Sequence, residues 1–172
     1  MFASKHTRAA VLVAAACCTL AGSASAQDGP PRAGQVFGDW RFDCTAITEA
    51  QSRCQLTQTM LAGELRQAVA RLGLAPDADG GMVLSALLPL GFSIPAGVRV
   101  AIDEGETIPL DLVRCVTAGC IAGHTLSADE ITALRLGVLL AISFDSAAGR
   151  TITLAGSLDG ISAGLDATGW DG

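Results

Sequence analysis

The sequence contains no tyrosine, and lysine and histidine are almost absent from it. Lys5 is the only lysine among 172 residues, and His6 and His124 are the only histidines. Seventeen acidic residues outnumber eleven basic ones, which gives a net charge of −6. A negative chain without a basic cluster repels phosphate backbones and anionic lipid surfaces, so we expect no nucleic-acid binding. The scarcity of histidine limits imidazole-dependent catalysis to His124, because His6 falls in the leader described next.

The first 26 residues have the pattern of a secretory signal peptide. Lys5 and Arg8 precede an apolar stretch over residues 9–22, and a small-residue cleavage site, Ala-Ser-Ala, follows at residues 24–26. The apolar stretch is shorter than the about 20 residues that cross a bilayer. We therefore expect cleavage near Ala26, which gives a periplasmic or secreted protein with no transmembrane segment in the mature chain.

The mature chain that remains is long enough for one domain with its own core. Residues 27–35 are rich in glycine and proline and are expected to form a flexible lead-in. No later linker, repeat or change of composition divides residues 36–172, which we interpret as a single domain. A lipoprotein signal is an alternative for the leader, because Cys17 and Cys18 follow small residues. The alanine at position 14, where such signals carry leucine, argues against it.

Several segments alternate between apolar and polar residues with a period of two, which is typical of half-buried β-strands. Residues 98–103 (VRVAID) and 151–156 (TITLAG) alternate in this way. Residues 136–144 (LGVLLAISF) lead through the turn DSAAG into the second of these segments, which predicts a hairpin. DEGE at residues 103–106 predicts an acidic turn after the first. Residues 62–73 (AGELRQAVARLG) fit a helix and a strand equally well.

One helix is clearly indicated. Ser127 and Glu130 form an S-x-x-E capping box, apolar residues follow at helical spacing, and Gly137 is a stop signal. We therefore expect one short helix over residues 127–136. Together these patterns predict a mainly β protein, an antiparallel β-sandwich of about eight or nine strands with this single helix.

Four cysteines remain after removal of the signal: Cys44, Cys54, Cys115 and Cys120. The second pair precedes His124, so RCVTAGCIAGH is compatible with a metal site, a thiol catalyst with its base, or a stapled hairpin. Neither spacing is the C-x-x-C form common in zinc and redox sites. An even count in an exported chain, with each pair closing one short loop, favours two disulfides. We expect Cys44–Cys54 and Cys115–Cys120 bonds, each contributing about 2–3 kcal/mol.

Other motifs invite a functional interpretation, and each has a simpler structural explanation. GISAG at residues 160–164 matches a nucleophile elbow around Ser162, but no histidine follows it. PDADGG at residues 76–81 begins like a calcium loop but lacks the closing glutamate, so we expect a turn. Trp40, near a disulfide, is expected to pack in the core, since a ligand-stacking role would require exposure. His124 is expected to be a surface or satisfied core histidine.

A series of short motifs resembles one known family. The motifs follow the family's order over residues 36–166, and they are FGDW-x3-C (Phe37 to Cys44), CQLTQ (Cys54 to Gln58), LPLG (Leu88 to Gly91), PAGV (Pro95 to Val98) and RC-x4-C (Arg114 to Cys120). In this series the chain is similar to the invasion-associated locus B (IalB) family of exported bacterial proteins, named for a role in host-cell invasion. The resemblance implies a secreted, periplasmic or surface β-rich protein with no known catalytic residues or cofactor. It also favours a strand for residues 62–73.

From these features we expect an exported, non-enzymatic β-domain that acts through contacts with a protein or envelope component, the host-cell surface being one candidate. Members of the family tend to be basic, whereas this mature chain is acidic, which argues against simple adhesion to anionic host cells. One alternative is a periplasmic ligand-binding module that uses Trp40 or a pocket between the sheets. A less favoured one is a hydrolase using Ser162, or a thiol enzyme using Cys120 with His124. We expect no catalytic residue, metal or cofactor, and the four disulfide cysteines are the only predicted site residues.

Overall fold

A computed structural model describes residues 31–49, 51–64 and 67–170. The signal peptide predicted for residues 1–26 lies outside these ranges. The strands of the described residues are β1 (Val36–Phe37), β2 (Trp40–Thr48), β3 (Gln51–Ala62), β4 (Gln67–Pro76), β5 (Met82–Leu88), β6 (Val98–Ile102), β7 (Thr107–Val116), β8 (Gly119–Leu126), β9 (Leu139–Asp145) and β10 (Thr151–Ser157). They form one antiparallel sheet in the order β1-β2-β3-β4-β5-β8-β7-β6-β9-β10.

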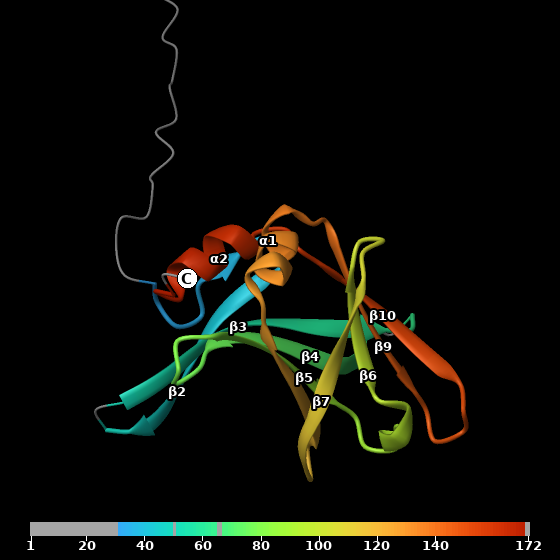
Figure 1. The fold of residues 1–172 in the computed structure, drawn as a ribbon. Helices are drawn as coiled ribbons and strands as arrows, with labels where there is room; N and C mark the ends of the chain where they lie inside the picture. Colours follow the sequence, from blue (N-terminus) through green and yellow to red (C-terminus); the bar gives the residue numbers. More distant parts are fainter. Residues whose placement is uncertain (1–30, 50, 65–66, 171–172) are drawn as a thin grey trace, which may run out of the picture.

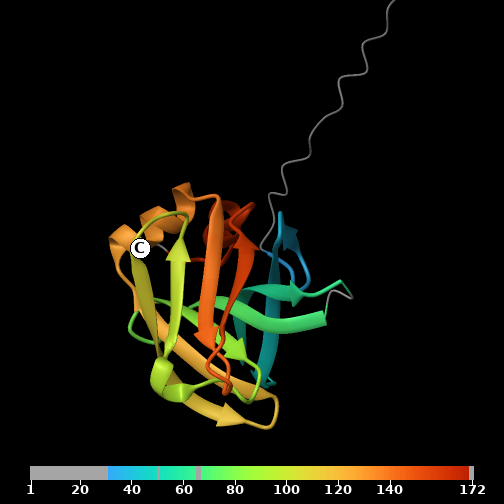
Figure 2. The ribbon, with the colours of Figure 1, turned by 90° about the vertical axis from the view of Figure 1, so that its right-hand side faces the viewer.

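The sheet does not close, and it folds over so that its two halves pack as layers. β6, β9 and β10 lie across from β2, β3 and β4 in Figure 1. After a quarter turn, Figure 2 shows the two layers with α1 (Ala128–Leu136) and α2 (Ile161–Ala167) together at one end. The mainly β, antiparallel architecture predicted from the sequence is confirmed. Residues 31–49, 51–64 and 67–170 contain ten strands where about eight or nine were expected, because β1 has only two residues and is too short to show alternation.

The alternating segments form the strands expected of them. Alternate residues of β6 are buried, and β6 pairs with β7 across the acidic turn at residues 103–106. β9 and β10 form the predicted hairpin, which runs without a bulge from Leu139 opposite Ser157 to Asp145 opposite Thr151. β9 also pairs with β6, so it is an interior strand with neighbours on both sides.

The ambiguous segment at residues 62–73 contributes to β4, which pairs with β3 on one side and β5 on the other. Leu72 and Leu74 are fully buried, whereas Arg71 is exposed, so the inward positions of this strand alternate. The strand favoured by the family resemblance is therefore confirmed. Tertiary pairing, rather than local propensity, decides between the two patterns.

Two α-helices occur in the described residues, α1 (Ala128–Leu136) and α2 (Ile161–Ala167), besides a short 3-10 turn, η1 (Ile94–Ala96). α1 begins with the predicted capping box between Ser127 and Glu130. α2 was not expected. It follows Gly160, which has a left-handed backbone conformation with a φ of 81°. It also contains Gly164, and glycine lowers helix propensity. Its buried residues, including Leu165, pack on the core and hold it in place.

Part of the expected lead-in is tied to the sheet. Gln35 N donates to Arg32 O at 2.9 Å, which closes a turn. Phe42 N then donates to Gln35 O at 2.8 Å, so the chain pairs with β2 just before β1 begins. Residues 27–30 lie outside the described part of the chain. Within the described ranges, no helix is both long and apolar enough to span a membrane.

Candidate functional site

Both predicted disulfides are present, and each joins directly opposite residues of a hairpin. Cys44 on β2 faces Cys54 on β3, with Cα atoms 4.0 Å apart. Cys115 on β7 faces Cys120 on β8, with Cα atoms 3.9 Å apart. The sulfur atoms are therefore bonded to one another, and none of them is a thiolate available to a metal or a substrate.

His124, which the sequence left without a partner, bonds to the capping box of α1. Its Nε2 lies 3.2 Å from Glu130 Oε2, and the same oxygen accepts from Ser127 N at 2.7 Å. Glu130 N in turn donates to Ser127 Oγ at 3.2 Å. Burial would by itself raise the pKa of the Glu130 carboxyl, but the hydrogen bonds from Ser127 and the contact with His124 hold that pKa below its ordinary value. The sequence signal for the cap was clear, whereas the histidine contact depends on where β8 places the ring.

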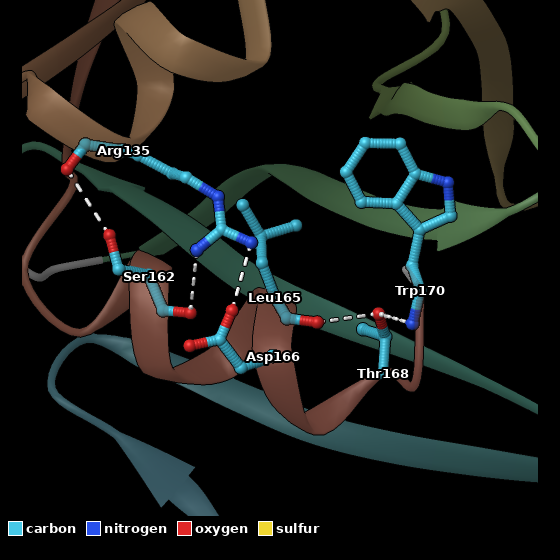
Figure 3. A network of polar contacts seen from close by, with 6 residues as sticks. All are labelled: Arg135, Ser162, Leu165, Asp166, Thr168 and Trp170. Carbon is cyan, nitrogen blue, oxygen red and sulfur yellow. Dashed lines mark hydrogen bonds and ion pairs between the residues drawn. The ribbon is translucent and has the colours of Figure 1, made fainter. Parts of the chain in front are cut away.

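Ser162 lies on α2 in a network that joins the two helices (Figure 3). Its Oγ donates to Arg135 O at 3.2 Å, and Arg135 Nη1 donates back to Ser162 O at 3.4 Å. Arg135 Nη2 also lies 2.9 Å from Asp166 Oδ1. The hydroxyl of Ser162 thus bonds to a main-chain carbonyl rather than to a general base. The side-chain orientation of Arg135 over α2, plain in Figure 3, gave no signal in the sequence because α2 itself was not predicted.

Trp40 is fully buried, as expected for a tryptophan near a disulfide. Its Nε1 donates to Ser157 O at 2.9 Å, so the indole joins β2 to the end of β10. Gln58, on β3, is also buried, and its side chain bonds to Ser157 as well. Its Oε1 accepts from Ser157 N at 2.9 Å, and its Nε2 donates to Ser157 O at 2.8 Å. Sequence analysis did not identify Gln58, because nothing in CQLTQ shows which strand lies opposite it.

The acidic segments considered in the sequence bond to nearby backbone. Asp103 accepts from Val138 N at 3.2 Å and from Leu139 N at 2.8 Å, which fixes the start of β9. Asp77 accepts from Asp79 N at 2.9 Å, which makes the turn expected for PDADGG. Across residues 31–49, 51–64 and 67–170, no three metal-binding side chains are grouped closely enough to hold an ion.

A surface groove runs between β10 and β3, and we call it the β10 groove. Its volume is about 470 Å³. The lining residues are Asp39, Gln58, Thr59, Met60, Leu61, Gly63, Leu139, Ala155, Gly156 and Ser157. Leu61 and Leu139 are 42% and 55% exposed, so the walls present apolar side chains to solvent. The groove therefore combines apolar walls, one carboxylate and the edge of a terminal strand.

A second hollow of about 360 Å³ adjoins the first at Ser157. Val138 lines it and is 69% exposed, and Asp159 supplies a carboxylate. Arg135 also lines it, but its guanidinium is paired with α2. Neither Asp39 nor Asp159 forms an ion pair with the described residues. The two hollows share Ser157, and their linings combine exposed apolar side chains with the carboxylates of Asp39 and Asp159.

Comparison with known proteins identifies relatives over most of the chain. Residues 40–169 match the family described as "Invasion associated locus B (IalB) protein". An invasion protein B homologue of Brucella abortus (strain 2308) is 26% identical over 154 residues, covering 84% of this chain and 83% of that protein. Invasion protein B of Bartonella bacilliformis is 24% identical over 135 residues, covering 76% of this chain and 72% of that protein.

A solved structure shares the fold. The crystal structure of invasion associated protein B from Bartonella henselae superposes with a TM-score of 0.67 at 26% identity, covering 77% of this chain and 91% of the other. The family match spans far more than half of the chain, and it includes both disulfides. The chain therefore belongs to the invasion associated locus B (IalB) family.

Proposed function

We propose that this protein is an exported, non-enzymatic β-domain that acts by binding a protein of the cell envelope or of a host surface. The observation that supports the proposal most directly is that each candidate reactive group already makes a structural contact. The four cysteines form disulfides, Ser162 Oγ donates to the main chain of α1, and the His124 ring bonds the helix cap through Glu130. In none of these contacts does a nucleophile lie beside a base.

Two features support export: the disulfide bonds and the pattern of the leader. The two disulfides fit an exported protein, because cytosolic thiols are kept reduced. The leader has the pattern of a signal peptide, and we propose cleavage near Ala26 and a periplasmic or secreted location. The relatives are named as invasion proteins, and we extend an invasion-associated role to this chain on that basis. The acidic mature chain indicates that contact with a host cell would not depend on attraction to anionic surfaces.

A small-ligand module built on Trp40 is no longer supported. The indole is fully buried and its N–H is already bonded to Ser157, so it has no face to offer a ligand. The β10 groove is bounded by a strand edge and by exposed leucines, which suits a polypeptide better than a small polar ligand.

Photo-crosslinking in living cells tests the proposal. Lys5, the only lysine of the sequence, precedes the proposed cleavage site, so lysine-directed reagents would find no lysine side chain in the mature protein. A photoreactive amino acid is therefore placed at Val138, beside the groove, and in a control at Val116, on the β7–β8 hairpin away from the helices (Figure 1). We expect a discrete adduct in the exported fraction from the first position only. A protein confined to the cytoplasm, or one that forms no adduct from Val138, would contradict the proposal.

A further inference from the structure

We propose that the open edge of β10 binds an extended, apolar and basic segment of a partner protein, which adds to the sheet as a further strand in the β10 groove. This inference rests on the proposed function and deepens it, because it names the surface and the chemistry of the partner. It follows from the direction of the β10 backbone groups, the composition of that edge and the lining of the groove.

The hydrogen bonds at both ends of the β9–β10 hairpin fix which β10 residues bond to β9. Leu158 N donates to Val138 O at 3.0 Å, just beyond one end of the paired region. Ser146 N donates to Arg150 O at 2.8 Å at the other end. Bonded and non-bonded positions alternate in an antiparallel pair, and the register between these ends has no bulge. The even-numbered residues of β10 therefore bond to β9, and the odd-numbered ones turn their N–H and C=O groups outward.

The outward positions are Thr151, Thr153, Ala155 and Ser157. β10 is the last strand of the sheet, so no strand of the described chain pairs with it on this side, and β3 approaches it across the β10 groove. At Ser157 the outward N–H and C=O groups already have a hydrogen-bond partner. The side-chain amide of Gln58 bonds both its N–H and its C=O, as the backbone of a neighbouring strand would. Thr151, Thr153 and Ala155 continue the same edge without such a partner.

β10 has none of the features that usually protect a free edge. Edge strands are commonly very short, bulged, or interrupted by proline and charge. The strand at the other end of the sheet, β1, has two residues. The part of β7 that extends past β6 carries Asp111 and Arg114 and has a bulge between Leu112 and Arg114. β10 has seven regularly paired residues, TITLAGS, with no proline and no charge.

The lining of the groove specifies the partner segment. The exposed side chains of Leu61 and Leu139 stand beside the β10 edge and offer contacts to apolar residues of an added strand. Asp39 is the only charged residue of the lining, and Asp159 adds a second carboxylate in the adjoining hollow. A basic residue in the segment would meet these carboxylates, whereas an acidic one would be repelled. Main-chain bonds supply affinity in this mode, and the walls supply selectivity.

Synthetic octapeptides are the probe. One peptide alternates threonine and valine around an arginine, a second carries glutamate in place of the arginine, and a third has prolines that prevent strand formation. Binding and amide hydrogen exchange are followed by NMR on the disulfide-bonded protein. In the free protein we expect rapid exchange at Thr153 and Ala155 and slow exchange at Ile152 and Leu154. The arginine peptide should slow the first pair about tenfold or more, and it should bind about tenfold more tightly than the glutamate peptide.

Two variants test the edge and the wall separately. Thr153→Pro removes an N–H that points away from β9, so the β9–β10 pairing is retained while the added strand loses a donor. Leu61→Asn removes an apolar contact from the wall without adding a charge or altering the β10 backbone. Each should weaken the arginine peptide about tenfold. Thr153→Val keeps the N–H, and Val116→Asn alters a distant exposed apolar residue, so both should bind as the wild type does.

Several results would overturn the inference. These are equal binding of all three peptides, no gain of protection at Thr153 and Ala155, or unchanged binding by both Thr153→Pro and Leu61→Asn. A wild-type protein that dimerises, and that Thr153→Pro makes monomeric, would assign the edge to a second copy of the chain instead. The proposed function is tested apart from this: a cellular crosslink that Thr153→Pro leaves intact would retain the protein contact and reject the β10 edge as its site.

Discussion

The side-chain amide of Gln58 binds the backbone of Ser157 as a neighbouring strand would, with Oε1 2.9 Å from Ser157 N and Nε2 2.8 Å from Ser157 O. The same carbonyl accepts Trp40 Nε1 at 2.9 Å. Trp40 and Gln58 lie in the layer opposite Ser157, and each is about a hundred positions from it in the sequence. The contact therefore joins β10 to β2 and β3 where the sheet would otherwise separate.

Gln58→Leu should destabilise the protein by about 2–4 kcal/mol, because it removes three hydrogen bonds, one to Asp39 O and two to Ser157, and leaves Ser157 N–H without its partner. Urea unfolding followed by tryptophan fluorescence measures the change. Gln67→Leu, at an exposed position on β4, is the matched control and should shift the unfolding free energy by less than about 0.5 kcal/mol. Equal effects of the two substitutions would show that the amide of Gln58 has no special role.

Gly156→Ala should disturb the same contact from the other side. A methyl group at position 156 would lie 2.4 Å from Gln58 Oε1 and 2.6 Å from Met60 Cε, so both side chains would have to move. We expect a loss of about 1–3 kcal/mol. Gly123→Ala, where the new methyl group meets nothing closer than 3.6 Å, is the control and should be tolerated. Thermal unfolding of the two variants decides the matter, and a Gly156→Ala protein as stable as the control would refute this description of the packing.

Glu130 should make stability depend on pH in the acid range. Burial of its carboxyl favours a raised pKa, but the hydrogen bonds from Ser127 and the contact with His124 outweigh it, so the folded-state pKa lies below the ordinary value of 4.5. A carboxyl whose pKa falls on folding adds stability above its unfolded-state pKa and loses it as the pH falls through the folded-state pKa. The wild type should therefore exceed Glu130→Gln by about 1 kcal/mol at neutral pH.

That difference should shrink as the pH falls below 4.5 and disappear once the wild-type carboxyl is protonated. Urea unfolding of both proteins at a series of pH values measures it. Asp129→Asn removes a charge from the same helical turn without touching the Ser127 cap, and it serves as the control. A difference between wild type and Glu130→Gln that stays constant across the acid range would contradict the lowered pKa.

The Cys115–Cys120 bond should be structural and dispensable for binding. Cys115→Ala combined with Cys120→Ala opens a very short loop, which should cost about 2 kcal/mol in the chain-entropy estimate. Removal of Cys44–Cys54, which closes a longer loop, should cost slightly more. Unfolding free energies give the costs, and the binding assay is repeated on the molecules that remain folded. Loss of binding without loss of stability would assign the hairpin a direct role.

The sequence was sufficient to predict the features that arise from local patterns. Alternation predicted β6, β9 and β10, and the Ser127 capping box predicted α1. The paired spacings predicted both disulfides, because each bond closes a single hairpin. In all of these cases the interacting residues lie close together in the chain.

The features that the sequence missed depend on long-range packing. α2 contains Gly164, and it is held by burial against residues such as Leu56 rather than by helix propensity. The bonds of Gln58 depend on which strand ends the sheet, and no local pattern gives the order of strands. For the same reason the β10 groove was beyond sequence analysis, since its two walls come from distant parts of the chain.

The most direct test of the central claim, an exported domain whose reactive groups are held in structural contacts, is the intact mass of the protein isolated from cell fractions. The protein is alkylated in denaturant with and without prior reduction. We predict that it occurs outside the cytoplasm as a chain beginning near Gln27, unmodified without reductant, and modified at four cysteines after reduction. A full-length chain in the cytoplasm that is alkylated without reduction would contradict the account.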